Sequence, residues 1–307
     1  MPRLALATAI AAAGSDDDLI PLLDACAAAG LDTSIRAWDD PSVTWSRFDV
    51  VLLRSTWDYT QRLPEFLQWC ERVSSQARLL NPLPVVRWNT DKHYLADLAA
   101  RGVPVIPSAF VEPEDDPLPA LQAFLAAHAD AAQFVVKPAI GAGSRDAQRY
   151  AREQEFAAAN HIARLLEGGR SVLLQPYLAS VDEAGETALV YFNGEYSHAI
   201  RKGPLLRLDD AATDALFAAE AITARTPGDD ERELGEQVLA AAMAQLGITA
   251  PLPYTRVDVI RDADGRPRLL ELELCEPSLF FTHAQGSAER FAGLLADDLK
   301  SGATTGC

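Results

Sequence analysis

The sequence predicts an α/β protein that begins with a doubly wound domain and continues with two α+β domains. Three observations predict this class. Strand and helix patterns alternate over residues 1–88, a glycine-rich turn follows an apolar strand near residue 140, and two hairpin patterns follow residue 186. We therefore expect an N-terminal domain over 1–88, a central domain over 89–180 and a C-terminal domain over 181–307.

The N-terminal domain follows the order of a parallel sheet with crossover helices. Residues 48–53 form a continuous apolar run, which is typical of a strand buried on both faces. Gly30 marks the end of the first helix, because glycine readily adopts the left-handed cap conformation. The expected elements are a strand at 3–8, a helix at 19–29, strands at 32–37 and 48–53, and a helix at 63–73.

A polar and aromatic segment directly follows the central apolar strand. Ligands of open α/β sheets bind at the carboxyl ends of the strands. We therefore predict that this segment holds a substrate, and loop packing is an equally good explanation for its two aromatic residues. The predicted substrate residues are Arg54, Trp57, Asp58 and Tyr59.

The first residues allow a second interpretation. Pro2-Arg3 followed by the apolar residues 4–13 resembles a short signal peptide. A single positive charge precedes the apolar stretch and a helix pattern follows at once, which favours a buried first strand.

The central domain is expected to begin with a helix capped by Asn89-Thr90-Asp91 and ended by Gly102. In the C-terminal domain, Asn193-Gly194 is a typical hairpin turn. The further elements of the central domain are a helix at 120–128, a strand at 134–138, a helix at 153–166 and a strand at 171–175. Those of the C-terminal domain are strands at 188–192 and 196–201, a helix at 231–246, an acidic hairpin and a helix at 288–299.

The acidic hairpin carries the strongest chemical signal. Two strand patterns flank Asp264-Gly265, which predicts a two-residue turn. With that turn Asp258 lies opposite Glu271. Arg256 lies opposite Glu273, and strand alternation places the four side chains on one face. Clustered carboxylates repel and are costly to desolvate, so oxygen ligands at this density suit Mg²⁺ bound to phosphates. A solvated strand face is the alternative for the hairpin taken alone.

Two lysines lie where an anion would stabilise them. Lys137 comes late in an apolar strand, before a glycine-rich turn whose N–H groups can form an anion nest. Lys92 lies in the first turn of the predicted helix, where the helix dipole disfavours a cation. A structural loop and a surface lysine are the alternatives. The sequence contains neither a Walker A loop nor a GxGxxG fingerprint.

The composition excludes several partners. With a net charge of −17 over 307 residues, neither nucleic acid nor an anionic membrane surface is expected to bind. No apolar run approaches the roughly 20 residues that span a bilayer. Cys26, Cys70, Cys275 and Cys307 show no metal-ligand spacing, which favours a reduced, cytoplasmic protein.

The order and spacing of these residues resemble the ATP-grasp superfamily of ligases over about residues 81–279. The resemblance implies that two lysines hold the nucleotide phosphates, that the glycine-rich loop covers them, and that the segment after residue 174 meets the adenine. It also implies an acidic residue on the ribose, for which Glu186 is preferred to Glu183. The implied ATP-binding residues are Lys92, Lys137, Gly141, Gly143, Ser144, Gln175, Tyr177, Leu178, Glu183 and Glu186.

The same resemblance implies a metal site and a catalytic group. In the superfamily an Asp and a Glu-x-Asn pair hold magnesium, and the corresponding residues here are Asp258, Glu271 and Glu273, with two Mg²⁺ ions expected. An arginine beside them would stabilise the transferred phosphoryl group, and a basic segment after the central hairpin would close over it. A basic surface loop is the alternative for that segment. The implied catalytic residues are Arg256, Lys202, Arg201 and His198.

Two departures separate the chain from the best-known members of the superfamily. Glu273 stands where Asn is usual, and Glu276 is inserted before Pro277. The stretches RSTWDY, NTDKHYL and ELELCEPSLFF resemble a small branch whose activity is the closure of O-ureido-D-serine to D-cycloserine. The branch implies an antibiotic-forming ligase that activates a carboxylate as an acyl phosphate for attack by a nitrogen of the same molecule.

Other functions remain open at this point. An intermolecular ligase joining a carboxylate to an amine would use the same nucleotide residues. A non-catalytic nucleotide-binding regulator would not need both lysines and all three carboxylates, and a Rossmann-type enzyme would need the fingerprint that the chain lacks. The expected partners are ATP and a small amino-acid-like carboxylate, and a homodimer is compatible with the sequence.

Overall fold

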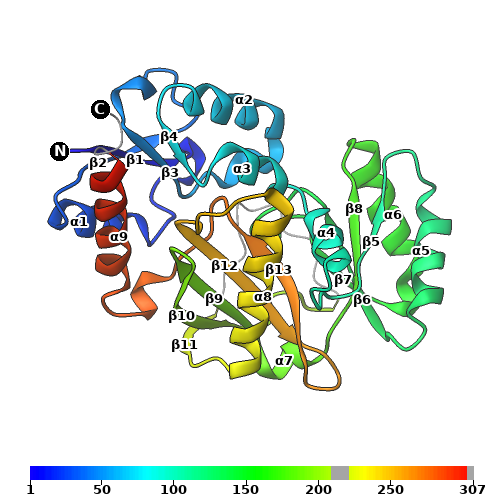
Figure 1. Cartoon of the computed structure of the whole chain (residues 1–307). Helices are drawn as coiled ribbons and strands as arrows, with labels where there is room; N and C mark the ends of the chain where they lie inside the picture. Colours follow the sequence, from blue (N-terminus) through cyan, green and yellow to red (C-terminus); the bar gives the residue numbers. More distant parts are fainter. Residues whose placement is uncertain (209–220, 303–307) are drawn as a thin grey trace.

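The computed structural model describes residues 1–208 and 221–302, which form three sheets with helices around them (Figure 1). Cys307 lies outside the described residues. The first sheet is parallel, with the strand order β2-β1-β3-β4. Its strands are β1 (Arg3–Thr8), β2 (Asp32–Ala37), β3 (Val50–Leu53) and β4 (Arg78–Leu80), and its helices are α1 (Leu19–Ala28), α2 (Leu63–Ser74) and α3 (Leu83–Asn89).

The two central strands of this sheet are buried on both faces, because residues 4–7 of β1 and 50–53 of β3 are all apolar. Leu4, Leu6 and Leu52 point to one layer, where they pack with α1 and with α9 (Ser287–Gly302). Ala5 and Val51 point to the other layer, which holds Phe66 and Trp69 of α2 and other aromatic side chains. The predicted doubly wound sheet is confirmed. The last helix, which we assigned to the C-terminal domain, packs against α1 instead (Figure 1).

The central sheet is antiparallel, with the order β5-β8-β6-β7. Helices α5 and α6 cover one of its faces, where Phe124, Phe134 and Ile162 form the core. The elements are β5 (Ala109–Val111), α5 (Pro117–Ala127), β6 (Gln133–Pro138), β7 (Gln148–Ala151), α6 (Glu155–Glu167) and β8 (Val172–Pro176).

The third sheet is also antiparallel, with the order β11-β10-β9-β12-β13. Helix α8 packs on one face, and α4 lies against α8. The elements are α4 (Tyr94–Ala100), α7 (Ser180–Ala184), β9 (Glu186–Phe192), β10 (Glu195–Lys202), β11 (Ile222–Arg225), α8 (Asp229–Leu246), β12 (Tyr254–Arg261) and β13 (Pro267–Glu273). Short 3-10 turns lie at Ile10–Ala12, Trp45–Arg47, Trp57–Gln61, Arg152–Gln154 and Phe281–His283.

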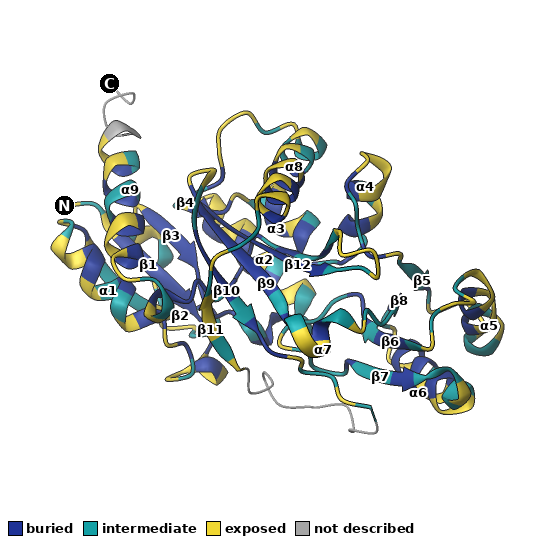
Figure 2. Cartoon of the chain, turned by 90° about the horizontal axis from the view of Figure 1, so that it is seen from below, coloured by how far each residue is buried: buried dark blue, intermediate teal, exposed yellow. Residues whose placement is uncertain are grey.

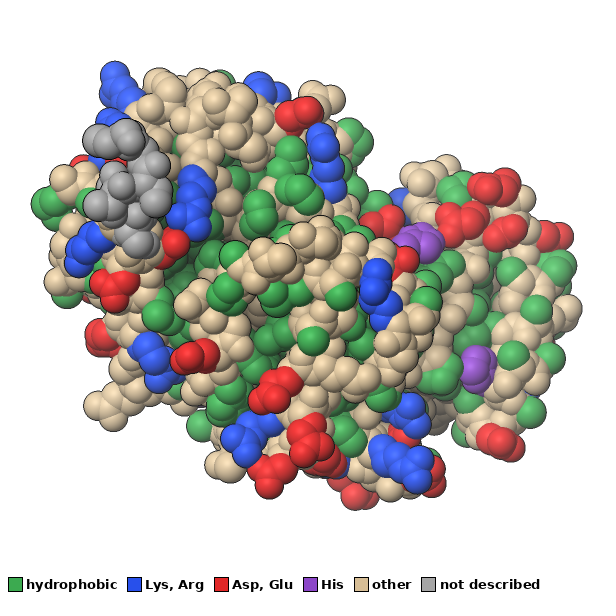
Figure 3. Space-filling model, viewed as in Figure 1, with side chains coloured by type: hydrophobic (Ala, Val, Ile, Leu, Met, Phe, Trp, Pro, Cys, Tyr) green, Lys and Arg blue, Asp and Glu red, His purple; other side chains and the backbone are tan. Residues whose placement is uncertain are grey.

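Figure 2 shows that β1, β3, β9 and β12 are largely buried, while α1, α5 and α8 expose their outer faces. On the face in Figure 3, Lys and Arg side chains are scattered among acidic ones, and the coloured residues form no continuous basic surface. Among the described residues, no helix combines the length and the apolar character that a membrane span requires.

The helix predicted after Asn89-Thr90-Asp91 and up to Arg101 is present as α4, but it begins later than predicted. Helix α3 ends at Asn89 and α4 begins at Tyr94. The Asn89 amide donates to the Leu272 carbonyl at 2.8 Å and its oxygen accepts the Leu274 N–H at 2.7 Å, so this side chain fastens β13 rather than capping a helix. Lys92 therefore lies in the turn between the helices, and not in a first helical turn.

The turn of the acidic hairpin was also predicted incorrectly. The Asp262 N–H donates to the Arg266 carbonyl at 2.8 Å, so three residues form the turn instead of two. A β-bulge between Asp258 and Val259 then shifts the register by one residue. Beyond the bulge, Asp258 pairs with Glu271 and Arg256 with Glu273, as the sequence predicted.

Candidate active site

A cavity of about 410 Å³ lies where the three sheets approach one another. Its wall combines the loop after β6, the segment after β8, the open face of β12 and β13, and loops of the N-terminal sheet. The predicted site residues that line it are Trp57, Tyr59, Lys92, Lys137, Gly141, Gly143, Ser144, Gln175, Tyr177, Leu178, Glu186, Lys202, Arg256, Glu271 and Glu273. Residues that the sequence spreads over more than 200 positions are thus brought together by the fold.

Two lysines stand beside the glycine-rich loop. The Lys92 ammonium donates to the Gly141 carbonyl at 2.6 Å and lies 2.9 Å from a Glu271 oxygen. Burial lowers the pKa of Lys137 to about 8, and the positive charge of Lys92 adds to this effect although Glu271 opposes it. Two neighbouring ammonium groups that are partly desolvated favour an anion between them. This part of the cavity is therefore suited to phosphate groups.

An apolar region forms another part of the cavity wall. Ile106, Val181 and Ile260 pack together there with Leu178 and Leu270. Gln175 lies behind this region, where its amide donates to the Ser108 hydroxyl at 2.9 Å. The Tyr177 ring lies under the Arg149 guanidinium, 3.5 Å from ring centre to carbon. The region offers a flat aromatic ligand both apolar contact and nearby backbone groups.

The structure distinguishes the two candidate acids after β8. Glu186 begins β9, lines the cavity and forms an ion pair with Lys202 at 2.5 Å. Glu183 lies on α7, where it is exposed and outside the cavity wall. This position favours Glu186 as the residue that meets a ligand.

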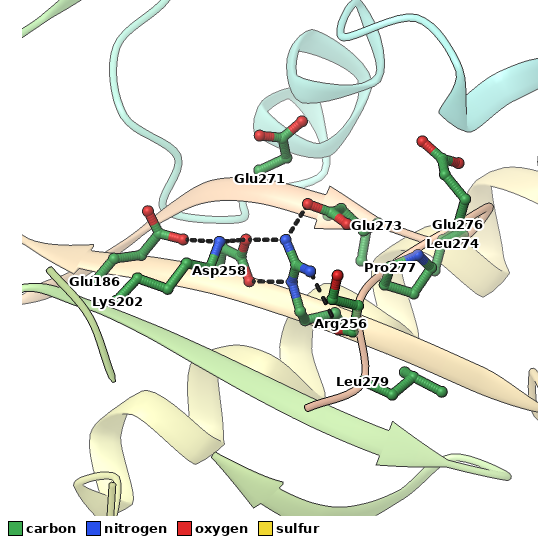
Figure 4. A network of polar contacts seen from close by, with 12 residues as sticks. Glu186, Lys202, Arg256, Asp258, Glu271, Glu273, Leu274, Glu276, Pro277 and Leu279 are labelled. Carbon is green, nitrogen blue, oxygen red and sulfur yellow. Dashed lines mark hydrogen bonds and ion pairs between the residues drawn. The ribbon is translucent and has the colours of Figure 1, made fainter. Parts of the chain in front are cut away.

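A chain of alternating charges crosses the floor of the cavity (Figure 4). Lys202 pairs with Glu186 and, at 2.7 Å, with Asp258. The Arg256 guanidinium donates to both oxygens of Asp258 at 2.9 Å and also binds Glu273. These side chains face one another because Arg256 and Asp258 alternate with the core residues of β12, and Glu273 lies opposite Arg256 on β13.

The charges of this network divide the carboxylates into two kinds. Burial alone would raise the pKa of Asp258, but Arg256 and Lys202 hold it well below its ordinary value. Lys92 and Lys137 similarly overcome the effect of burial on Glu271 and lower its pKa. For Glu273, burial prevails and raises the pKa to about 7, although Arg256 opposes it. Asp258 and Glu271 are thus firmly anionic, whereas Glu273 can gain a proton near neutral pH.

The sequence of a bacterial relative decides the family. The cycloserine biosynthesis protein DcsG of Streptomyces lavendulae is 49% identical over 300 residues, which cover 98% of this chain and 100% of that protein. The chain belongs to the D-cycloserine synthetase family of ATP-grasp ligases. The family model for the N-terminal domain of D-cycloserine synthetase DcsG matches residues 4–81.

Solved structures agree with this family. The crystal structure of D-cycloserine synthetase DcsG has a TM-score of 0.92 and 48% identity, and the match covers 97% of this chain and 99% of that one. A D-alanine–D-alanine ligase from Bacillus anthracis has a TM-score of 0.67 at 14% identity, over 99% of this chain and 98% of that one. The predicted ATP-grasp fold and ligase class are confirmed.

Several residues that we predicted in the site of this D-cycloserine synthetase family member do not line the cavity. His198 is buried, with its Nε2 at 2.8 Å from the Leu279 carbonyl oxygen. Arg201 points to the other face of β10 and donates to the carbonyls of Ala184 and Glu183. The expectation that His198 and Arg201 lie over a phosphoryl group is therefore wrong for this conformation, and Lys202 alone of the three lines the cavity.

Two predicted substrate residues support the wall without forming it. Arg54 is 1% exposed and donates to the Pro277 carbonyl at 2.9 Å, and it lies 3.7 Å from Asp18. Asp58 accepts the Trp38 indole N–H at 2.8 Å and pairs with Arg62. Both side chains therefore hold protein groups, which corrects the expectation that they contact a substrate.

The sequence analysis missed an acidic segment between β1 and α1. Asp16, Asp17 and Asp18 all line the cavity. Asp18 accepts the backbone N–H groups of residues 279, 280 and 281 at 2.5–3.0 Å and so fixes the turn that closes one side of the site. The segment belongs to the connection that leaves the carboxyl end of β1, so the rule that ligands gather at such ends could have identified it.

In the part of the chain that the structure describes, no three Asp, Glu, His or Cys side chains converge closely enough to hold a metal ion as they stand. The three predicted metal ligands are engaged by Arg256, Lys202 and Lys92. Their chemistry nevertheless fits magnesium, since all of them offer carboxylate oxygens on one sheet face, and Glu271 and Glu273 reach the cavity. Magnesium bound there would have to replace lysine or arginine contacts.

Proposed function

We propose that the protein closes O-ureido-D-serine to D-cycloserine in an ATP- and Mg²⁺-dependent reaction. The observation that carries this proposal is the 49% identity, over nearly the whole chain, to a cycloserine biosynthesis protein. The cavity supports it, because it joins a basic region for phosphates, an apolar region for a base and a carboxylate cluster.

We place the nucleotide along this cavity. Lys92, Lys137 and the glycine-rich loop would hold the phosphates, and the apolar region around Ile260 would hold the adenine. Glu186 would accept hydrogen bonds from the ribose. Solved ATP-grasp relatives carry such ligands: one D-alanine–D-alanine ligase from Bacillus anthracis is complexed with ATP, and the ATP-grasp ligase PsnB with Mg and ADP.

We assign the magnesium ligands to Asp258, Glu271 and Glu273. Magnesium bound there would neutralise the β- and γ-phosphate oxygens during phosphoryl transfer. Arg256 lies between Asp258 and Glu273 and would hold the reacting carboxylate or the acyl phosphate once the latter forms.

The proposed reaction has two bond-forming steps. An oxygen of the substrate carboxylate attacks the γ-phosphorus of ATP, which gives an acyl phosphate and ADP. The nitrogen bound to the side-chain oxygen then attacks the acyl carbon, and phosphate leaves as the five-membered ring closes. Hydrolysis of the ureido group releases D-cycloserine, carbon dioxide and ammonia. The cavity wall would shield the acyl phosphate from bulk water before the ring closes.

The test is an assay of ADP release with Mg-ATP and a panel of substrates. We expect release with O-ureido-D-serine alone, because nucleophile and carboxylate belong to one molecule. The panel also contains free amino acids, each with and without a hydroxylamine-type nucleophile. Release that requires two co-substrates would support an intermolecular ligase and overturn the cyclisation. ATP binding without ADP release on any substrate would support a regulatory protein.

A further inference from the structure

Glu276 is a buried carboxyl group on the cavity wall to which the proposed mechanism gives no role. It follows β13, lines the cavity and is 9% exposed. The Trp57 indole N–H donates to its carbonyl at 3.1 Å, and Arg54 donates to the carbonyl of the next residue at 2.9 Å. The backbone that carries Glu276 is therefore fixed to the loop after β3.

No lysine or arginine forms an ion pair with Glu276 in the described residues, in contrast to the acids near it. The other four acids labelled in Figure 4 each pair with Lys92, Lys202 or Arg256. In Figure 4 Glu276 lies beyond Glu273 as seen from Lys202 and Arg256, and within the described residues it takes part in no ion pair. Lys92 acts on it only at longer range, where its charge favours the carboxylate. The Tyr59 hydroxyl, which also lines the cavity, acts on this carboxyl and favours its charged form. Burial and the negative charge of Glu273 raise the pKa of Glu276 to about 8.

A buried carboxylate without a cation is costly, so a cationic ligand group would be bound strongly at this place. An amino-acid substrate carries one such group. Its carboxylate has to reach the cationic end of the network around Arg256, where phosphoryl transfer is expected. Its α-ammonium group then needs an anion that no lysine or arginine already holds, and Glu276 meets this requirement.

We propose that Glu276, with the Tyr59 hydroxyl beside it, binds the α-ammonium group of the amino-acid substrate. This inference rests on the proposed function and adds to it a residue that selects the substrate. Because Glu276 is tied to the loop after β3, the contact would place the ammonium group on the N-terminal side of the cavity. The nucleotide would remain on the opposite side, near Lys137.

The test compares two substrates in the full-length enzyme: O-ureido-D-serine and the same ureidooxy acid without its amino group. We expect Glu276→Gln to raise the KM for O-ureido-D-serine about 30-fold or more, as in the loss of a buried charge pair. For the des-amino acid, kcat/KM of the variant should stay within about threefold of the value for the unchanged enzyme. The KM for ATP should also stay within about threefold. Tyr59→Phe should give a smaller effect in the same direction, and Glu289→Gln, at an exposed position on α9, is the matched control.

The two substrates separate this role from others. If Glu276→Gln lowers kcat/KM equally for both, the residue acts on the shared chemistry, for example as a proton acceptor, and the inference is overturned. A variant that still prefers the amino substrate as strongly as the unchanged enzyme also overturns it. Failure of the unchanged enzyme to release ADP with O-ureido-D-serine would overturn the proposed function, and with it this inference.

Discussion

Glu273 is the residue in which the site differs most from the superfamily pattern, because a carboxylate stands where Asn is usual. The structure shows why a carboxylate is tolerated at this position. Arg256 binds Glu273 directly, and burial raises the pKa of Glu273 to about 7. An arginine that would otherwise face Asp258 alone thus bridges two acids.

We expect Glu273→Gln to lower kcat for ADP release about 100-fold or more, because it removes a charge from the proposed magnesium site. The fold should remain, since glutamine has nearly the same volume. The measurement is steady-state kinetics at saturating ATP and amino acid, together with a circular dichroism spectrum. Full turnover by a folded variant would show that the magnesium site does not need the charge of Glu273.

Glu276 also makes stability depend on pH. Its pKa is about 8 in the folded protein and near 4.5 when exposed, so the folded state holds the extra proton between these values. Stability therefore falls as pH rises from about 5 to 8. We expect Glu276→Gln to stabilise the ligand-free protein at pH 8 and to change it little at pH 5. Melting temperatures at both pH values test this, and equal shifts at both would contradict it.

At the scale of the element, β12 and β13 show how a correct prediction arose from an incorrect turn. The three-residue turn shifts the pairing by one position, and the bulge at Leu270 shifts it back. Apolar alternation indicates which face each strand presents, but it does not reveal a bulge. The bulge matters for the site, because Leu269 enters the core while Leu270 and Glu271 line the cavity.

The junction of α7 and β9 depends on Gly185. Its φ is +72°, and a Cβ atom there would lie 2.5 Å from the Lys202 carbonyl oxygen. We expect Gly185→Ala to destabilise the protein by about 1–3 kcal/mol and to reduce activity, because β10 must shift Lys202 away from Glu186. Urea denaturation and ADP release are the measurements.

The control is Gly265→Ala in the turn of the acidic hairpin. Gly265 has a similar φ of +77°, but nothing lies within 4 Å of an added Cβ atom. The Gly265→Ala variant should lose no more than about 1 kcal/mol of folding free energy and keep its activity. An equal loss of stability in the Gly185→Ala and Gly265→Ala variants would mean that backbone strain, and not the contact with Lys202, explains the loss.

At the scale of the whole molecule, the sequence predicted that the proposed nucleotide-binding residues converge, because their order resembles a known superfamily. Contacts between distant segments had no comparable local signal. Asp18 binds N–H groups that are more than 260 residues away, and α9 returns to the first sheet. The positions of Arg54, Asp58 and Arg201 were missed for the same reason, since each holds a protein group that only the fold brings near.

The central claim is that one substrate molecule supplies both the carboxylate and the nitrogen nucleophile. The most direct measurement is the stoichiometry of ADP and D-cycloserine in a reaction that contains only enzyme, Mg-ATP and O-ureido-D-serine. The account predicts equal amounts of the two products at every enzyme concentration, and no further increase when a free amine is added. ADP formed without D-cycloserine, or D-cycloserine formed without ATP, would contradict it.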